Sequence, residues 1–222
     1  MNHHLTIKHL GPINQCNLDL TQFTVLTGPQ SNGKSTVAKA VYFFRSVKQD
    51  ILDIMMQGGP QAVMGTAKAK WEKCLTQRLK EKFMQLFGTS WVMPQDMFME
   101  YLYSQNVFIQ VSLTQNWDSG DINYITIEYS EIIKDYFVEL DSHGTFADFN
   151  WHQKEHEKKD LDELFNDPFE TIFIPAGRNL ITLLSTQLNY IFTSLEGSQL
   201  RNIDYVTKRY TELILKLKPL FT

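Results

Sequence analysis

One nine-residue run, GPQSNGKST, constrains the fold of this chain more than any other feature. It fits the pattern G-x-x-x-x-G-K-[ST], in which a glycine-rich loop brings backbone N–H groups together around phosphates. Residues 23–27 before it are β-branched and apolar, and residues 37–44 after it have helical character. We therefore predict a buried parallel strand, the loop and a helix, in this order. The loop comprises Gly28, Pro29, Gln30, Ser31, Asn32, Gly33, Lys34, Ser35 and Thr36.

Each residue type in this loop has a chemical reason to be there. Gly28 and Gly33 let the backbone wrap closely because they carry no side chain. Lys34 is the candidate catalytic residue, with its ammonium between the β- and γ-phosphates, and the Ser35 hydroxyl is the candidate Mg²⁺ ligand. Thr36 would reach the α-phosphate side, and a helix beginning near Lys34 would direct its positive dipole end at the anion. We predict a nucleotide-binding protein; the alternative is a glycine-rich turn that binds nothing.

The segment before the loop narrows the class. Residues 5–10 and 13–20 read as two short alternating strands around the turn Gly11-Pro12. Over about the first 45 residues, the string LTIKHLGPINQCNLDLTQFTVLTGPQSNGKST resembles the N-terminal lobe of the SMC, RecF and OLD group of ABC-type AAA family ATPases. Residues 172–178, IFIPAGR, are similar to the strand followed by Pro-Ala-x-Arg in many bacterial ATPases of this group.

This resemblance implies an α/β fold: a P-loop NTPase lobe of ABC type with an antiparallel β-subdomain and inserted helices. Residues 1–222 would form one lobe. Residues 1–50 would carry the ribbon, loop and first helix, residues 51–170 an insertion of helices and β-meander, and residues 171–222 a core strand and the start of a helical arm. The implied ligands are ATP, preferred over GTP through the family alone, and Mg²⁺. The implied partners are a second copy or a second ATPase lobe, with DNA as a candidate, in a cytoplasmic switch for DNA processing or anti-phage defence.

Two family motifs are missing from the sequence. The best acidic positions after apolar runs are Glu139 and Asp141, but they precede the Pro-Ala-x-Arg segment, which is the wrong order for the family's Asp-Glu strand. Residues 195–199 resemble the signature loop only superficially, and a helix-terminating turn at Gly197 is the plainer interpretation. We therefore expect a lobe that is incomplete without a C-terminal part, and leave open whether the chain alone hydrolyses ATP. The alternatives are a nucleotide-binding interaction subunit that does not hydrolyse and a P-loop kinase or GTPase, whose Arg-rich lid and N-K-x-D motif do not occur.

Arg178 is the candidate phosphate sensor outside the loop. It follows the strand-like residues 171–174, so it would lie at the carboxyl edge of a strand, where open α/β sheets bind ligands. Pairing with a carboxylate or capping of carbonyls is an equal alternative. Asn179 and Gln187 are weaker candidates for positioning water.

The middle of the chain mixes helix and strand patterns. We predict a helix over residues 67–87, three strands at 107–113, 124–129 and 135–140 forming an antiparallel meander, and a helix over 205–217. The basic residues of the first helix could face a phosphate backbone or form a solvated face. They are Lys68, Lys70, Lys73, Arg78, Lys80 and Lys82.

Composition and residue spacing argue against three other classes of protein: general nucleic-acid binders, metalloproteins and membrane-spanning proteins. The net charge of −4 gives no general attraction to nucleic acid, so DNA contact would need a local basic patch. Cys16 and Cys74 fit no metal spacing, and reduced buried thiols are expected. Residues 152–156, HQKEH, match the H-x-x-E-H form of a zinc-protease helix, but strongly charged neighbours favour a solvated segment. No apolar run approaches the roughly 18 residues that span a bilayer.

Overall fold

The computed structural model of the chain describes residues 3–60, 65–88, 96–113, 124–142, 151–176 and 205–217. Within these ranges the fold is mixed α/β, with a five-stranded antiparallel sheet and six helices. The chain divides into two compact units, Met1–Glu170 and Thr171–Thr222. The first unit holds the sheet, the helices α1 to α5 and the glycine-rich loop, and the second unit holds α9.

The sheet has the strand order β2-β1-β3-β4-β5, and each neighbouring pair is antiparallel. The predicted hairpin is confirmed: β1 pairs with β2 from His3↔Leu20 to Leu10↔Ile13, around a turn in which Gly11 has a φ of 57°. The strands are β1 (His3–Leu10), β2 (Ile13–Leu20), β3 (Phe98–Ser104), β4 (Val107–Leu113) and β5 (Ile125–Tyr129).

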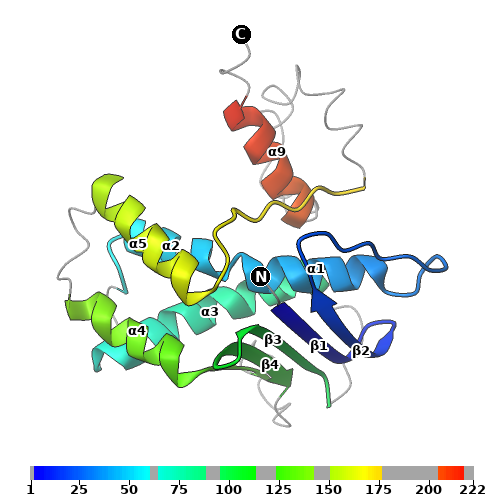
Figure 1. Cartoon of the computed structure of the whole chain (residues 1–222), viewed down its shortest axis with the longest axis horizontal. Helices are drawn as coiled ribbons and strands as arrows, with labels where there is room; N and C mark the ends of the chain where they lie inside the picture. Colours follow the sequence, from blue (N-terminus) through cyan, green and yellow to red (C-terminus); the bar gives the residue numbers. More distant parts are fainter. Residues whose placement is uncertain are drawn as a thin grey trace. The chain divides into compact units, whose positions relative to one another are not determined.

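Helices α1 and α3 lie on the same side of the sheet (Figure 1). Alternate strand residues such as Leu5 and Tyr101 are fully buried, as expected for a sheet with one covered face. The Phe44 ring of α1 stacks on the Tyr101 ring at 5.3 Å between centroids. The helices of the first unit are α1 (Lys34–Arg45), α2 (Val47–Met56), α3 (Ala67–Phe87), α4 (Glu131–Ser142) and α5 (Trp151–Leu164); the second unit contains α9 (Tyr205–Leu217).

Several sequence predictions are confirmed and one strand prediction is wrong. The helices over 67–87 and 205–217 and the strands at 107–113 and 125–129 are present. Residues 135–140, predicted as a strand, belong to helix α4. Ile133, Tyr136, Phe137 and Leu140 are its buried apolar residues, and their spacing is that of one helix face. The meander therefore pairs β3, β4 and β5, and β3 was not predicted.

The strand predicted before the loop is also absent. Residues 23–27 form no strand, and the side chains of Phe23 and Val25 are 83% and 63% exposed. Two threonines explain the local path: the Thr24 hydroxyl oxygen accepts a hydrogen bond from the Thr21 N–H at 3.3 Å, and the Thr21 hydroxyl donates to the Phe23 carbonyl at 2.9 Å. Such side-chain bonds to backbone compete with strand pairing. Residues 171–174 in the second unit likewise form no strand.

The coarse fold class is therefore confirmed as α/β with an antiparallel sheet and added helices. The described strands contain no parallel pair, and an antiparallel sheet is not typical of a P-loop NTPase. Whether residues 1–222 form one lobe stays a prediction. Among the ranges described, no helix has the length and apolar character needed to cross a membrane.

Candidate functional site at the start of helix α1

The glycine-rich loop ends where α1 begins. Gly33 is the residue that precedes the helix, with φ 85° and ψ 6°, and its carbonyl accepts the N–H of Val37 at 2.9 Å. The N–H groups at the start of a helix have no partner within the helix, so those of Lys34, Ser35 and Thr36 are available to an anion. This first turn contains no acidic residue that would repel one.

Three loop residues have positive φ angles. Gly28 has a φ of 146°, Ser31 of 66° and Gly33 of 85°. Ser31 is the informative one, because a residue with a Cβ rarely occupies the left-handed region and does so at an energetic cost. Left-handed residues in a loop turn successive N–H groups toward one side, which is how anion-binding nests form.

The Lys34 side chain folds back across the loop. Its ammonium donates hydrogen bonds to the carbonyl oxygens of Gly28, at 2.7 Å, and Pro29. Residues 28–32 are exposed, and Gly33 is buried. The structure thus places a cation against the backbone of an exposed loop, next to the first turn of α1.

The hairpin turn holds Gly33 in place. A Cβ at Gly33 would lie 2.6 Å from Ile13 Cγ1 and 3.3 Å from Pro12 Cγ. These distances are too short for any larger residue unless the side chains of Ile13 and Pro12 move. The turn between β1 and β2 therefore supports the loop directly, which gives the Gly-Pro-Ile sequence a structural reason.

A cavity of about 530 Å³ adjoins the loop on the side of Ser35 and Thr36. Its opposite wall is the C-terminal end of α3, where Leu86 and Phe87 are 3% and 6% exposed. The Lys39 ammonium donates to the Leu86 carbonyl at 3.0 Å, so α1 and the end of α3 are joined at this wall. The cavity is lined by Gly11, Pro12, Ser35, Thr36, Lys39, Leu86 and Phe87.

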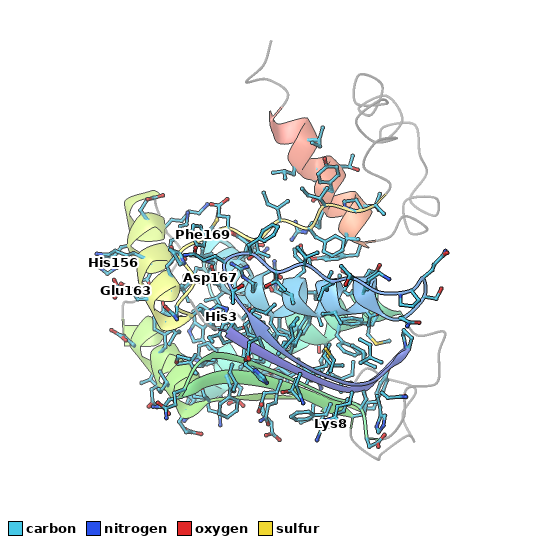
Figure 2. All side chains as sticks on the ribbon, turned by 45° about the vertical axis from the view of Figure 1, so that its right-hand side comes forward. His3, Lys8, His156, Glu163, Asp167 and Phe169 are labelled. Atoms are coloured by element: carbon cyan, nitrogen blue, oxygen red, sulfur yellow. The ribbon has the colours of Figure 1, made fainter. Side chains whose placement is uncertain are left out.

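The far end of α1 is anchored by a buried ion pair. The Arg45 guanidinium donates to both carboxylate oxygens of Asp167 at 2.8 Å, and Asp167 is 1% exposed. Burial alone would raise the pKa of Asp167, but the hydrogen bonds and charge of Arg45, with the charge of Lys48, outweigh it and lower that pKa. His3 bonds the neighbouring Asn166 carbonyl at 3.2 Å, and Figure 2 shows His3 and Asp167 close together. Helix α1 is thereby fixed at both ends.

The structure describes few of the candidate residues outside the loop. Arg178, Asn179, Gln187 and residues 195–199 lie outside the described residues. Glu139 lies exposed on helix α4 and does not follow a strand.

The sequence analysis did not predict the cavity wall formed by Lys39, Leu86 and Phe87. Two sequence signals could have indicated it: the position of Lys39 one turn after Ser35, and the end of a helix before Gly88.

The basic residues of α3 are partly engaged with carboxylates. Lys82 is 4% exposed and pairs with Asp50. Arg78 contacts Asp50 at 3.0 Å and Asp53 at 2.7 Å. Lys68 contacts Glu131 of α4 at 2.9 Å. Lys70, Lys73 and Lys80 therefore remain as the basic residues of α3 that could face the phosphate backbone of a nucleic acid.

The zinc hypothesis stays untested, because the side chain of His152 lies outside the described residues. The imidazole of His156 on α5 lies 3.0 Å from the Asp160 carboxylate. The part of the chain that the structure describes contains no group of three His, Cys, Asp or Glu residues that could hold a metal ion. Cys16 and Cys74 are free thiols, and burial raises the pKa of both.

A scan against protein-family models and searches of curated proteins and of solved structures found no match to this chain.

Proposed function

We propose that this chain is the Mg-ATP-binding lobe of an ABC-type ATPase, in which nucleotide binding drives a conformational switch. The observation that carries the proposal is the GPQSNGKST loop at the N-terminus of α1, with Gly33 left-handed against the hairpin turn and Lys34 folded across the loop. A phosphate-binding loop needs this combination of a glycine-permitted turn, free N–H groups and one positioned lysine.

Different residues of the loop bind different parts of the phosphate chain. The N–H groups of the first turn of α1 bind phosphate oxygens. Lys34 moves from the Gly28 and Pro29 carbonyls onto the β- and γ-phosphates, a short movement because its ammonium already lies over the loop. The exposed Ser35 hydroxyl fits an Mg²⁺ ion, which prefers oxygen ligands and is commonly held by few protein groups together with phosphates and water. Bound Mg²⁺ would neutralise phosphate charge.

A subunit that binds nucleotide without hydrolysing it is the second candidate. It is favoured by the exposure of the apolar residues directly before the loop, Phe23 at 83% and Val25 at 63%. An apolar segment of this kind beside a ligand site is typical of a surface that another polypeptide covers. In this form of the proposal, a second copy or a second ATPase lobe completes the site. DNA processing or anti-phage defence is the proposed setting, by resemblance alone.

The test is equilibrium binding of labelled ATP with and without Mg²⁺, followed by single-turnover hydrolysis with protein in excess. Lys34→Ala should weaken Mg-ATP binding at least about tenfold, equivalent to about 1.4 kcal/mol. Lys159→Ala is the matched control, because Lys159 is exposed on α5. Binding without cleavage would favour the non-hydrolysing subunit, and cleavage that Lys34→Ala abolishes would favour an ATPase. Equal ATP binding by Lys34→Ala and the unaltered chain would refute both.

A further inference from the structure

We propose that the cavity between the hairpin turn, α1 and the end of α3 receives the sugar and base of the bound nucleotide, with Phe87 and Lys39 as its recognition residues. This inference rests on the proposed function, because the phosphates must occupy the loop for the nucleoside to reach the cavity. It adds a wall supplied by α3, which no loop motif specifies.

The cavity adjoins the loop directly. Ser35 and Thr36 belong both to the loop and to the cavity lining. In a nucleotide whose β- and γ-phosphates lie in the loop, the α-phosphate joins them to the sugar. The α-phosphate is the one assigned to the side of Thr36. The sugar and base must then lie beyond Thr36, and the cavity begins there.

The wall of the cavity combines apolar surface with a positively charged group. Pro12, Leu86 and Phe87 offer apolar surface for the faces of a base, and Lys39 offers N–H donors for sugar hydroxyls. Binding sites for small molecules typically combine mostly apolar walls with a few polar groups and have volumes of roughly 300–1,000 Å³. The cavity of about 530 Å³ falls within that range.

The α3 wall is held in place before any ligand binds. The Phe87 ring packs against the Phe83 ring at 4.9 Å between centroids, and Phe83 is fully buried. The Lys39 ammonium bonds the Leu86 carbonyl at 3.0 Å. Helix α3 ends at Phe87, because the next residue, Gly88, has a non-helical φ of 75°. A wall fixed in this way loses little conformational entropy on binding.

The test compares Mg-ATP with magnesium tripolyphosphate, which has the phosphates without the nucleoside. We expect the unaltered chain to bind Mg-ATP at least about tenfold more tightly, and Phe87→Ala and Lys39→Met to remove most of this difference while tripolyphosphate binding changes less than about twofold. Phe87→Leu should give an intermediate loss and serves if Phe87→Ala does not fold. If these variants weaken the binding of both ligands equally, or of neither, the assignment of the cavity is overturned. The proposed function would then still be supported by binding that depends on Lys34. Binding of neither ligand to the unaltered chain would overturn the function itself.

A second readout uses the unaltered protein. Mg-ATP should slow acetylation of the Lys39 amine, followed by mass spectrometry, at least about fivefold relative to the ligand-free chain. Tripolyphosphate should protect Lys34 but leave Lys39 reactive, and Lys159 should react equally in all three samples. Equal protection of Lys39 by both ligands would mean that this lysine contacts phosphate and that the cavity does not hold the nucleoside.

Discussion

Gly33 combines a backbone requirement with a packing requirement. Its φ of 85° favours glycine, and a Cβ there would lie 2.6 Å from Ile13 Cγ1. We expect Gly33→Ala to destabilise the fold by about 2–4 kcal/mol, as the sum of backbone strain and overpacking, with the free energy of unfolding measured in urea.

Two further variants separate these causes. Gly28 has a φ of 146° with nothing within 4 Å of an added Cβ. Gly28→Ala should therefore destabilise the fold through backbone strain alone, with a smaller loss of unfolding free energy than Gly33→Ala. Removing the Ile13 Cγ1 and Cδ1 atoms by Ile13→Ala should relieve the clash, so the double variant should lose less than the sum of the single losses. Equal losses for Gly28→Ala and Gly33→Ala would contradict the contact with the hairpin turn.

The buried His3 imidazole makes the stability of the fold dependent on pH. It is 1% exposed, and its ring nitrogens bond the Tyr101 hydroxyl at 2.8 Å and the Asn166 carbonyl at 3.2 Å. Burial lowers the pKa of His3, although the Asn166 carbonyl and the Asp167 charge oppose this effect and the Arg45 charge adds to it.

The sign of the dependence follows from this lowered pKa. As pH falls below about 6.5, the unfolded chain binds a proton at His3 that the folded chain resists. The free energy of unfolding should therefore fall between pH 6.5 and the lower pKa of the folded state. Urea unfolding from pH 7.5 to 5 checks this, and His3→Gln should flatten the slope in that window. An unchanged slope would assign the dependence to other groups.

Among the elements, helix α3 shows what a sequence pattern can predict. Its apolar residues recur at helical spacing, and Gly88 follows its last residue, so its predicted bounds agree with the structure. Helix α4 shows the limit: Tyr136, Phe137 and Val138 favour a strand by type, but burial of Ile133, Phe137 and Leu140 on one face decides for a helix. Local preference yields to packing when the two disagree.

The ion pair between α1 and the segment after α5 should matter more than an ion pair on the surface. Asp167→Asn leaves the Arg45 guanidinium without its carboxylate, and we expect a loss of about 2–4 kcal/mol, somewhat below a fully buried pair because the Arg45 side chain is 26% exposed. The control is Lys68→Met, which removes a pair with Glu131, whose side chain is 70% exposed, and should change stability by less than about 1 kcal/mol. Similar losses in urea unfolding for both variants would contradict a structural role for Asp167.

At the scale of the whole molecule, the site divides into a part that sequence specifies and a part that only the fold creates. The loop residues are contiguous, so a motif finds them. Lys39 and Phe87 are 48 positions apart in sequence and meet through the packing of α1 on α3, which no local pattern encodes. The strand expected before the loop is absent for a related reason. A buried strand needs a neighbouring strand to pair with, and among the described strands β2, which precedes residues 23–27, pairs only with β1.

The division into two units gives a prediction for the chain as a whole. The sheet, helices α1 to α5 and the glycine-rich loop all lie within Met1–Glu170. A fragment of residues 1–170 should therefore unfold cooperatively in urea and bind magnesium tripolyphosphate about as tightly as the full chain does. A fragment that binds tripolyphosphate more weakly than the full chain would contradict this prediction, and a fragment without a cooperative transition would show that the first unit does not fold alone.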